Sequence, residues 1–169
     1  MSTDTVSRFE SSLSGVGVGL TRTTANEFAA TLEAEVEPPA VGAPLGIEGV
    51  SLSDAGVNTD PTNGELQEAQ TGVTRAGKGI ASYGTLVVQS DAGGTEPVAL
   101  YPPNHVAVLR ESDVLSDVGS ALTWLGEEFD AGRDSAVFAT GRSATADMGE
   151  LVFGVHGPVD VHVLLVTDR

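Results

Sequence analysis

Val161-His162-Val163-Leu164-Leu165-Val166 is an almost unbroken apolar run in a chain of 169 residues. A second run of this kind is His105-Val106-Ala107-Val108-Leu109. Short, continuous runs of Val and Leu are typical of strands that are buried on both faces, in the middle of a parallel sheet. Such a sheet requires helices on both sides. The sequence therefore predicts an α/β fold, a three-layer α/β/α arrangement with a mostly parallel sheet.

The remaining elements are expected on either side of these runs. Val6, Phe9 and Leu13 lie on one face of a first helix. A second helix follows the sequence Thr24-Ala25-Asn26-Glu27, which has the spacing of a capping box, and ends before Pro38-Pro39. Ser112 is the expected cap of a third helix, with a core face of Val114, Val118, Ala121, Leu122, Leu125 and Phe129. Further strands are expected at residues 16–20, 72–74, 84–88, 136–139 and 151–153, and residues 40–66 are expected to be mainly an irregular connection. Residues 1–169 are expected to form one domain, with a helical N-terminal part at 1–39.

The charge is strongly negative: 24 acidic residues stand against 8 basic ones, for a net charge of −16. Lys78 is the single lysine. Such a chain repels nucleic acids and anionic membranes, so both are excluded as partners. Because molar salt shortens the Debye length to ~3 Å, we interpret this composition as that of a protein from a salt-loving organism, a halophilic archaeon; the alternative is an ordinary acidic protein.

Cysteine is absent from the sequence. This excludes disulfides, thiolate zinc sites, cysteine nucleophiles and iron–sulfur clusters held by this chain. The three histidines are not spaced as metal ligands, so no metal site is expected. There is no signal-like N-terminal segment and no run of ~18 apolar residues, which leads us to expect a soluble, cytoplasmic protein.

Two glycine-rich segments resemble nucleotide-binding motifs and depart from them. Residues 72–79 nearly spell a phosphate-binding loop, but Gly79 stands where a Ser or Thr must hold magnesium, and the flanking residues favour strands. Residues 15–19 lack the third glycine of a dinucleotide fingerprint, because Leu20 takes its place. Neither segment predicts a nucleotide site.

Two loops beside apolar strands are candidate sites. His156 lies between glycines and a proline in Gly154-Val155-His156-Gly157-Pro158, and Asp147 ends the polar segment 140–147. In α/β proteins such loops hold ligands at sheet edges. For segment 140–147 the alternative is a helix cap, by Ser143 or by Thr145 with Asp147. For His162, inside the last strand, a packed or hydrogen-bonded side chain is the more usual role.

Four segments resemble motifs of the LUD domain family, in its lactate utilisation protein C branch. They are Ala81-Ser82-Tyr83-Gly84-Thr85, Pro103-Asn104-His105-Val106, Gly141-Arg142-Ser143-Ala144-Thr145-Ala146-Asp147-Met148 and Gly154-Val155-His156-Gly157-Pro158. They stand in the family's order within residues 70–169. Departures from its pattern are Ser82 for Glu, Tyr83 for Thr, Arg142 for Pro and Gly149 for Glu.

The resemblance implies a fold like that of sugar-phosphate isomerases and CoA transferases. It also implies a part in oxidising L-lactate to pyruvate, beside partner subunits that carry the Fe–S clusters. The leading hypothesis is a non-redox subunit or accessory protein that binds a small carboxylate or phosphorylated ligand, with no cofactor of its own. The alternative is a free-standing isomerase or acyl/CoA-transferase-like enzyme, with Asp147 as general base or ligand anchor and His156 as proton donor.

The candidate site residues are in two groups. The candidate catalytic residues are Asp147 and His156, and the candidate ligand-binding residues are Gly84, Thr85, His105, Ser143, Thr145 and Gly157. Since neighbouring parallel strands bring their carboxyl ends to one edge, we expect the loops of Asp147 and His156 to converge there, beside the Gly84–Thr85 turn.

Overall fold

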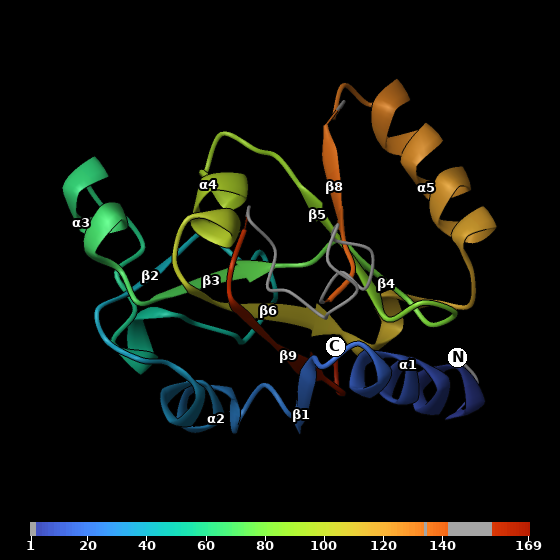
Figure 1. Ribbon diagram of the computed structural model, residues 1–169, viewed down its shortest axis with the longest axis horizontal. Coiled ribbons are helices and arrows are strands. Elements are labelled where there is room, and N and C mark those ends of the chain that lie inside the picture. The colour runs from blue at the N-terminus through green and yellow to red at the C-terminus, as the bar shows by residue number, and fades with distance from the viewer. Residues whose placement is uncertain (1–2, 134, 142–156) are drawn as a thin grey trace, which may run out of the picture.

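The central element of the fold is a parallel sheet (Figure 1). The structure is a computed structural model that describes residues 3–133, 135–141 and 157–169. All neighbouring strands of the sheet run parallel, in the order β1 (Gly19–Thr23), β9 (Asp160–Val166), β6 (Asn104–Arg110), β3 (Thr71–Arg75) and β2 (Ala40–Gly42). The two apolar runs of the sequence are the middle strands β6 and β9. The predicted mostly parallel sheet is confirmed.

Alternate residues of the middle strands enter two different cores. On β6, Ala107 and Leu109 pack toward α1 (Thr3–Gly15), whose Phe9 is fully buried. Val106 and Val108 pack toward the opposite face, against α2 (Phe28–Glu35). Burial on both faces explains why these strands read as continuous apolar runs rather than as alternating ones. The predicted α/β class, with helices flanking the sheet, is confirmed.

A second sheet, which the sequence did not predict, lies beside the first. Its order is β7 (Val114–Leu115), β4 (Lys78–Ile80), β5 (Thr85–Gln89) and β8 (Ala136–Ala139), and the β4–β5 and β5–β8 pairs are antiparallel. The chain passes from β3 to β4 within two residues: the Ala76 N–H donates to Val108 in the first sheet, and the Gly77 N–H donates to Val87 in the second. Helix α5 (Val118–Asp130) covers the outer side of this sheet (Figure 1).

Several expected element boundaries were wrong. The first strand begins at Gly19 rather than at residue 16. Helix α2 has no side-chain cap, since the Thr24 hydroxyl donates to the Glu27 carboxylate in a turn ahead of the helix. Helix α5 begins at Val118 and is capped by Asp117, not by Ser112.

The expected core face of α5 was also too wide. Val114 belongs to β7, while Leu122 and Phe129 are 58% and 47% exposed. Only Ala121 and Leu125 of the predicted face are fully buried on this helix. The helix packs on a small sheet, which covers a narrow stripe of it.

Short elements fill segments that the sequence pattern left unassigned. They are η1 (Ser53–Ala55), α3 (Asn63–Glu68), α4 (Thr95–Leu100) and η2 (Glu111–Asp113). The strand expected at 151–153 lies outside the described residues. Within the described ranges, every helix is too short or too polar to cross a bilayer.

Candidate functional site

A cleft of about 510 Å³ opens where several strands end. Arg75 is the last residue of β3, Arg110 the last of β6 and Gln89 the last of β5. Ligand crevices of α/β proteins lie outside the carboxyl ends of strands, so this position is typical of a binding site. We refer to it as the basic cleft; it is lined by Pro44, Leu45, Gly46, Arg75, Gly77, Lys78, Gln89, Asp91, Thr95, Arg110, Asp113, Trp124, Glu128 and Arg133.

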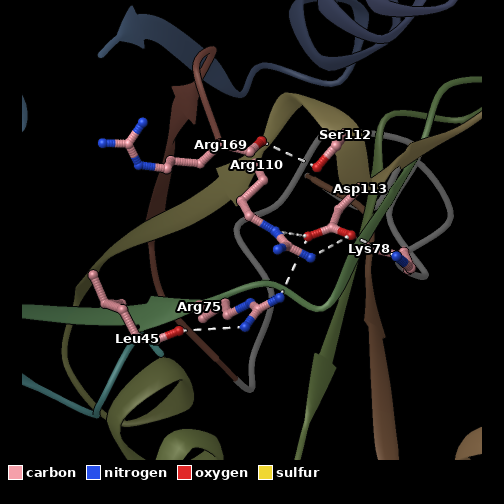
Figure 2. Close-up of polar contacts among 7 residues, drawn as sticks. All are labelled: Leu45, Arg75, Lys78, Arg110, Ser112, Asp113 and Arg169. Carbon is pink, nitrogen blue, oxygen red and sulfur yellow. Dashed lines mark hydrogen bonds and ion pairs between the residues drawn. The ribbon is translucent and has the colours of Figure 1, made fainter. Parts of the chain in front are cut away.

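Asp113 anchors three basic side chains in this cleft (Figure 2). Its carboxylate accepts hydrogen bonds from Lys78 Nζ at 2.5 Å, from Arg110 Nε at 2.6 Å and Nη2 at 3.0 Å, and from Arg75 Nη2 at 3.4 Å. The Asp113 side chain is only 3% exposed. Burial alone raises the pKa of this carboxyl, but the hydrogen bonds and charges of Arg110 and Lys78 outweigh it and lower the pKa below the ordinary value of 3.8.

The other acidic residues of the cleft have partners too. Glu128 accepts hydrogen bonds from Arg133 Nε at 2.5 Å and from Gln89 Nε2 at 2.7 Å, and these bonds lower its pKa to about 2. Asp91 accepts hydrogen bonds from the Thr95 hydroxyl at 2.7 Å and from the Thr95 backbone amide. Each carboxylate is thus held in a fixed place.

Four of the eight basic residues of the chain line this cleft: Arg75, Lys78, Arg110 and Arg133. Three acidic residues line it, namely Asp91, Asp113 and Glu128. Positive charge therefore exceeds negative charge here, in a chain where acidic residues outnumber basic ones by three to one. Four cations against three carboxylates leave one positive charge in excess, and an excess of one sign of charge in a cleft attracts ions of the opposite sign.

Two further features of the cleft bear on ligand binding. Lys78 Nζ lies 5.4 Å from the centroid of the Trp124 ring, in a cation–π contact that holds the ammonium group. Arg75 Nε is buried and has no hydrogen-bond partner among the described residues. An unpaired buried donor costs about 1–3 kcal/mol, which is a reason to expect a functional role for Arg75.

The structure places Gly84 and Thr85 in a tight turn against α1. Gly84 has φ +63°, and a Cβ atom built on it would lie 2.7 Å from the backbone nitrogen of Leu13. The hydroxyl of Thr85 is 2.6 Å from that of Thr140, which follows β8. Gly84 and Thr85 do not line the basic cleft.

His105 is a residue of β6, and its buried side chain contacts Thr74 on the neighbouring strand β3. It is 3% exposed, and its Nε2 is 2.9 Å from the hydroxyl of Thr74. Burial lowers its pKa to about 4, so the side chain is neutral near pH 7. His162 is also hydrogen-bonded, with Nε2 2.9 Å from the Thr21 hydroxyl and 3.6 Å from Glu35.

A smaller, mainly apolar cavity of about 240 Å³ lies at the amino ends of β1 and β9. Gly141 and Gly157 both line it, and so does Pro158; Gly157 and Pro158 are the described residues of the predicted His156 loop. Asp147, His156, Ser143 and Thr145 lie outside the described residues.

Convergence of the two predicted loops at one edge requires that the strands before them be parallel neighbours. That premise is wrong for β8, the strand before Asp147, because it lies in the second sheet and pairs antiparallel with β5. Gly157 stands ahead of β9, at the amino end of the strand. The basic cleft, in contrast, does lie at carboxyl ends of parallel strands, but of β3 and β6.

Sequence reasoning missed the basic residues of the cleft. The available signal was an arginine directly after two of the expected strands, Arg75 after 72–74 and Arg110 after 105–109, in a chain with few basic residues. Residues 72–79 do not open a helix, as expected, yet Arg75, Gly77 and Lys78 contribute to the cleft through their positions at the β3–β4 junction. No group of three or more potential metal ligands is found within the described ranges.

Comparisons with known proteins agree with the fold. Residues 9–166 match the LUD domain. A crystal structure of a DUF162 family protein from Deinococcus radiodurans superimposes with a TM-score of 0.75, over 98% of this chain and 99% of that one, at 23% identity. This likeness shows that the two chains share a fold.

The chain is also similar to proteins named lactate utilization protein C. The protein of Geobacillus sp. (strain WCH70) is 32% identical over 107 residues, 61% of this chain and 44% of that protein. The Bacillus subtilis (strain 168) protein is 30% identical over 109 residues, 62% of this chain and 45% of that protein. The chain thus spans about half the length of these curated relatives. With the family match covering most of the sequence, the chain belongs to the LUD domain family.

Proposed function

We propose that the chain is a non-redox accessory component of a cytoplasmic lactate utilisation system and that it binds a small anionic ligand in the basic cleft. Its similarity to lactate utilisation C proteins supports the first part. The observation that carries the second part is the placement of four of eight basic residues around one cleft.

The accessory role follows from the chemistry that this sequence lacks. Without cysteine the chain has no thiolate to ligate an iron–sulfur cluster. Electron transfer from lactate is therefore assigned to partner subunits that carry Fe–S clusters. Affinity purification from native extract at high salt is expected to recover an Fe–S or flavin protein, and recovery of neither would contradict this assignment.

Growth on lactate tests the proposed role in the cell. Deletion of the gene is expected to abolish growth on L-lactate and to leave growth on pyruvate unchanged, with rescue by the wild-type gene. The Arg75→Gln/Lys78→Gln double variant is expected not to rescue, because it removes two of the cations around Asp113. Arg8→Gln, on the exposed surface of α1, is the matched control and is expected to rescue. Normal growth of the deletion strain on lactate would contradict the proposal.

Asp147 and His156 remain proposed functional residues. If they contact ligand, Asp147→Asn and His156→Ala are expected to leave thermal melting nearly unchanged and to abolish lactate-dependent growth. If they only cap a helix or bond a turn, each is expected to cost about 1 kcal/mol of stability and to leave growth intact. Turnover of lactate, sugar phosphates or acyl-CoA thioesters by the purified protein would favour a free-standing enzyme instead.

A further inference from the structure

We propose that the ligand of the basic cleft carries a phosphate dianion and is considerably larger than lactate, with the phosphate bound by Arg75, Lys78 and Arg110. This inference rests on the proposed binding of an anion in the cleft and names the class of that anion.

The charge balance around Asp113 is the first argument. Three basic side chains donate to one carboxylate, so around Asp113 the positive charges exceed the negative charge by two. The other two acidic residues of the cleft have different hydrogen-bond partners: Glu128 is paired with Arg133, and Asp91 is bonded to Thr95. The charge around Asp113 therefore suits a ligand with two negative charges better than it suits lactate, which carries one.

The geometry of the donors is the second argument. Arg110 uses Nε and Nη2 for Asp113, and Lys78 uses one of its three N–H groups, so both keep donors that Asp113 does not occupy. Figure 2 shows the three basic side chains gathered around Asp113. A phosphate group has three terminal oxygens and accepts charge-assisted hydrogen bonds from several donors at once, which suits two guanidinium groups and one ammonium group.

The size of the cleft is the third argument. A volume of about 510 Å³ lies within the range of about 300–1,000 Å³ that is typical of pockets for cofactor-sized ligands. A three-carbon acid fills only a small part of it. The lining also offers the indole of Trp124 and the guanidinium of Arg133, which provide apolar and polar surface for the remainder of a larger molecule.

Asp113 is a positioning residue in this scheme, because its carboxylate bonds all three of the cations that are proposed to bind the phosphate. Asp113→Asn removes a negative charge and would strengthen anion binding if charge alone mattered. We expect it to weaken binding instead, because Arg75, Lys78 and Arg110 lose the carboxylate that fixes them. Stronger binding by Asp113→Asn would show that the cluster is not preorganised for the ligand.

Isothermal titration calorimetry of the purified full chain, at one fixed KCl concentration, tests the ligand class. The probes are inorganic pyrophosphate, ribose 5-phosphate, adenosine diphosphate and L-lactate. We expect at least one phosphate-bearing probe to bind about tenfold or more tightly than L-lactate, and the pattern among the three distinguishes a sugar phosphate from a nucleotide. Lys78→Gln and Arg75→Gln are each expected to weaken that binding about tenfold, the loss typical of a charged hydrogen bond. Arg8→Gln is expected to bind as the wild type does.

The outcomes separate this inference from the proposed function. Binding of L-lactate as tight as that of every phosphate-bearing probe, or equal losses in Arg8→Gln and Lys78→Gln, would overturn the phosphate assignment. Tight phosphate binding with unimpaired growth of the deletion strain on lactate would uphold this inference and contradict the lactate role. Circular dichroism of each variant establishes that it is folded. Asp113→Asn is a further check, because it is expected to weaken phosphate binding, whereas the loss of a negative charge by itself would strengthen it.

Discussion

At the scale of single residues, His105 is a candidate ligand-binding residue whose side chain is buried in the core. It stands on the middle strand β6, is 3% exposed, and bonds Thr74 on the neighbouring strand. A histidine beside a proline and an asparagine at the start of a strand gives no local sign of whether it points into the core or out. The pairing of β6 with β3 decides this.

The buried His105 predicts a pH dependence of stability. Its pKa in the folded state is about 4, whereas the ordinary value is 6.5, so between these values the unfolded chain takes up a proton that the folded chain does not. Above pH 6.5, His105 therefore hardly changes the free energy of unfolding. As the pH falls toward 4, it lowers the free energy of unfolding progressively, by about 2 kcal/mol between pH 7.5 and pH 5. Urea unfolding of the wild type and of His105→Gln, which keeps a hydrogen-bonding group toward Thr74, measures it. Identical pH profiles for the two proteins would contradict the prediction.

Substitution of Gly84 by alanine is expected to lower the stability of the fold, and the same substitution at Gly56 is the control. Its φ of +63° disfavours any other residue, and a Cβ atom would also meet the backbone of Ser12 and Leu13 in α1. Gly56 has φ +70° with open space around it. Gly56→Ala is expected to cost about 1–2 kcal/mol for the left-handed backbone alone. Gly84→Ala is expected to cost roughly 1–3 kcal/mol more, because α1 must shift. Equal losses in thermal unfolding would show that the contact with α1 is not tight.

At the scale of elements, a capping box is found at a helix where the sequence did not predict one. Thr62 caps α3: its hydroxyl accepts from the Glu65 amide at 3.3 Å, and Glu65 accepts from the Thr62 amide at 2.7 Å. Thr24 and Glu27 have the same spacing, but there the Thr24 hydroxyl donates to the Glu27 carboxylate, and the N-cap of α2 makes no side-chain hydrogen bond. The spacing alone does not distinguish a helix start from a turn, because both place these side chains within reach.

The two threonines give a matched pair of variants. Thr62→Ala is expected to cost α3 about 1 kcal/mol, seen as faster amide hydrogen exchange in residues 63–68. The melting temperature is expected to change little, since α3 has no fully buried residue. Thr24→Ala is expected to leave the exchange of α2 unchanged, because no amide of that helix is bonded to its side chain. Faster exchange in α2 would show that Thr24 does cap it.

At the scale of the whole molecule, the net charge of −16 predicts a dependence on salt. Mutual repulsion of the acidic residues is screened as the ionic strength rises, so the melting temperature is expected to increase with KCl well beyond physiological concentrations. Circular dichroism melts across a KCl series measure this. A variant with Glu33→Lys and Glu68→Lys, both at exposed positions, has a less negative charge and is expected to respond less to salt. A melting temperature that stays flat up to molar KCl would contradict the interpretation.

The fold class and most of the central elements can be predicted from the amino-acid sequence alone. The apolar runs at 105–109 and 161–166 form the middle strand β6 and its neighbour β9. Val6, Phe9 and Leu13, at helical spacing, form the buried face of α1. These features are local, because burial on one face of an element gives its own residues a helical or strand period, and burial on both faces gives a continuous apolar run. The family motifs are likewise runs of adjacent residues, and they identified the LUD domain correctly.

The second sheet and the basic cleft, in contrast, depend on how distant segments of the chain pack together in three dimensions. The cleft combines residues from Pro44 to Arg133, contributed by strand ends, loops and α5. Asp113 gathers partners that stand up to 38 positions away in the chain. A solvated arginine and one that binds a buried carboxylate have the same local sequence pattern, because the difference lies in which strand ends meet. The order and direction of the strands decide which strand ends lie side by side, and the periodicity of the sequence does not specify that order.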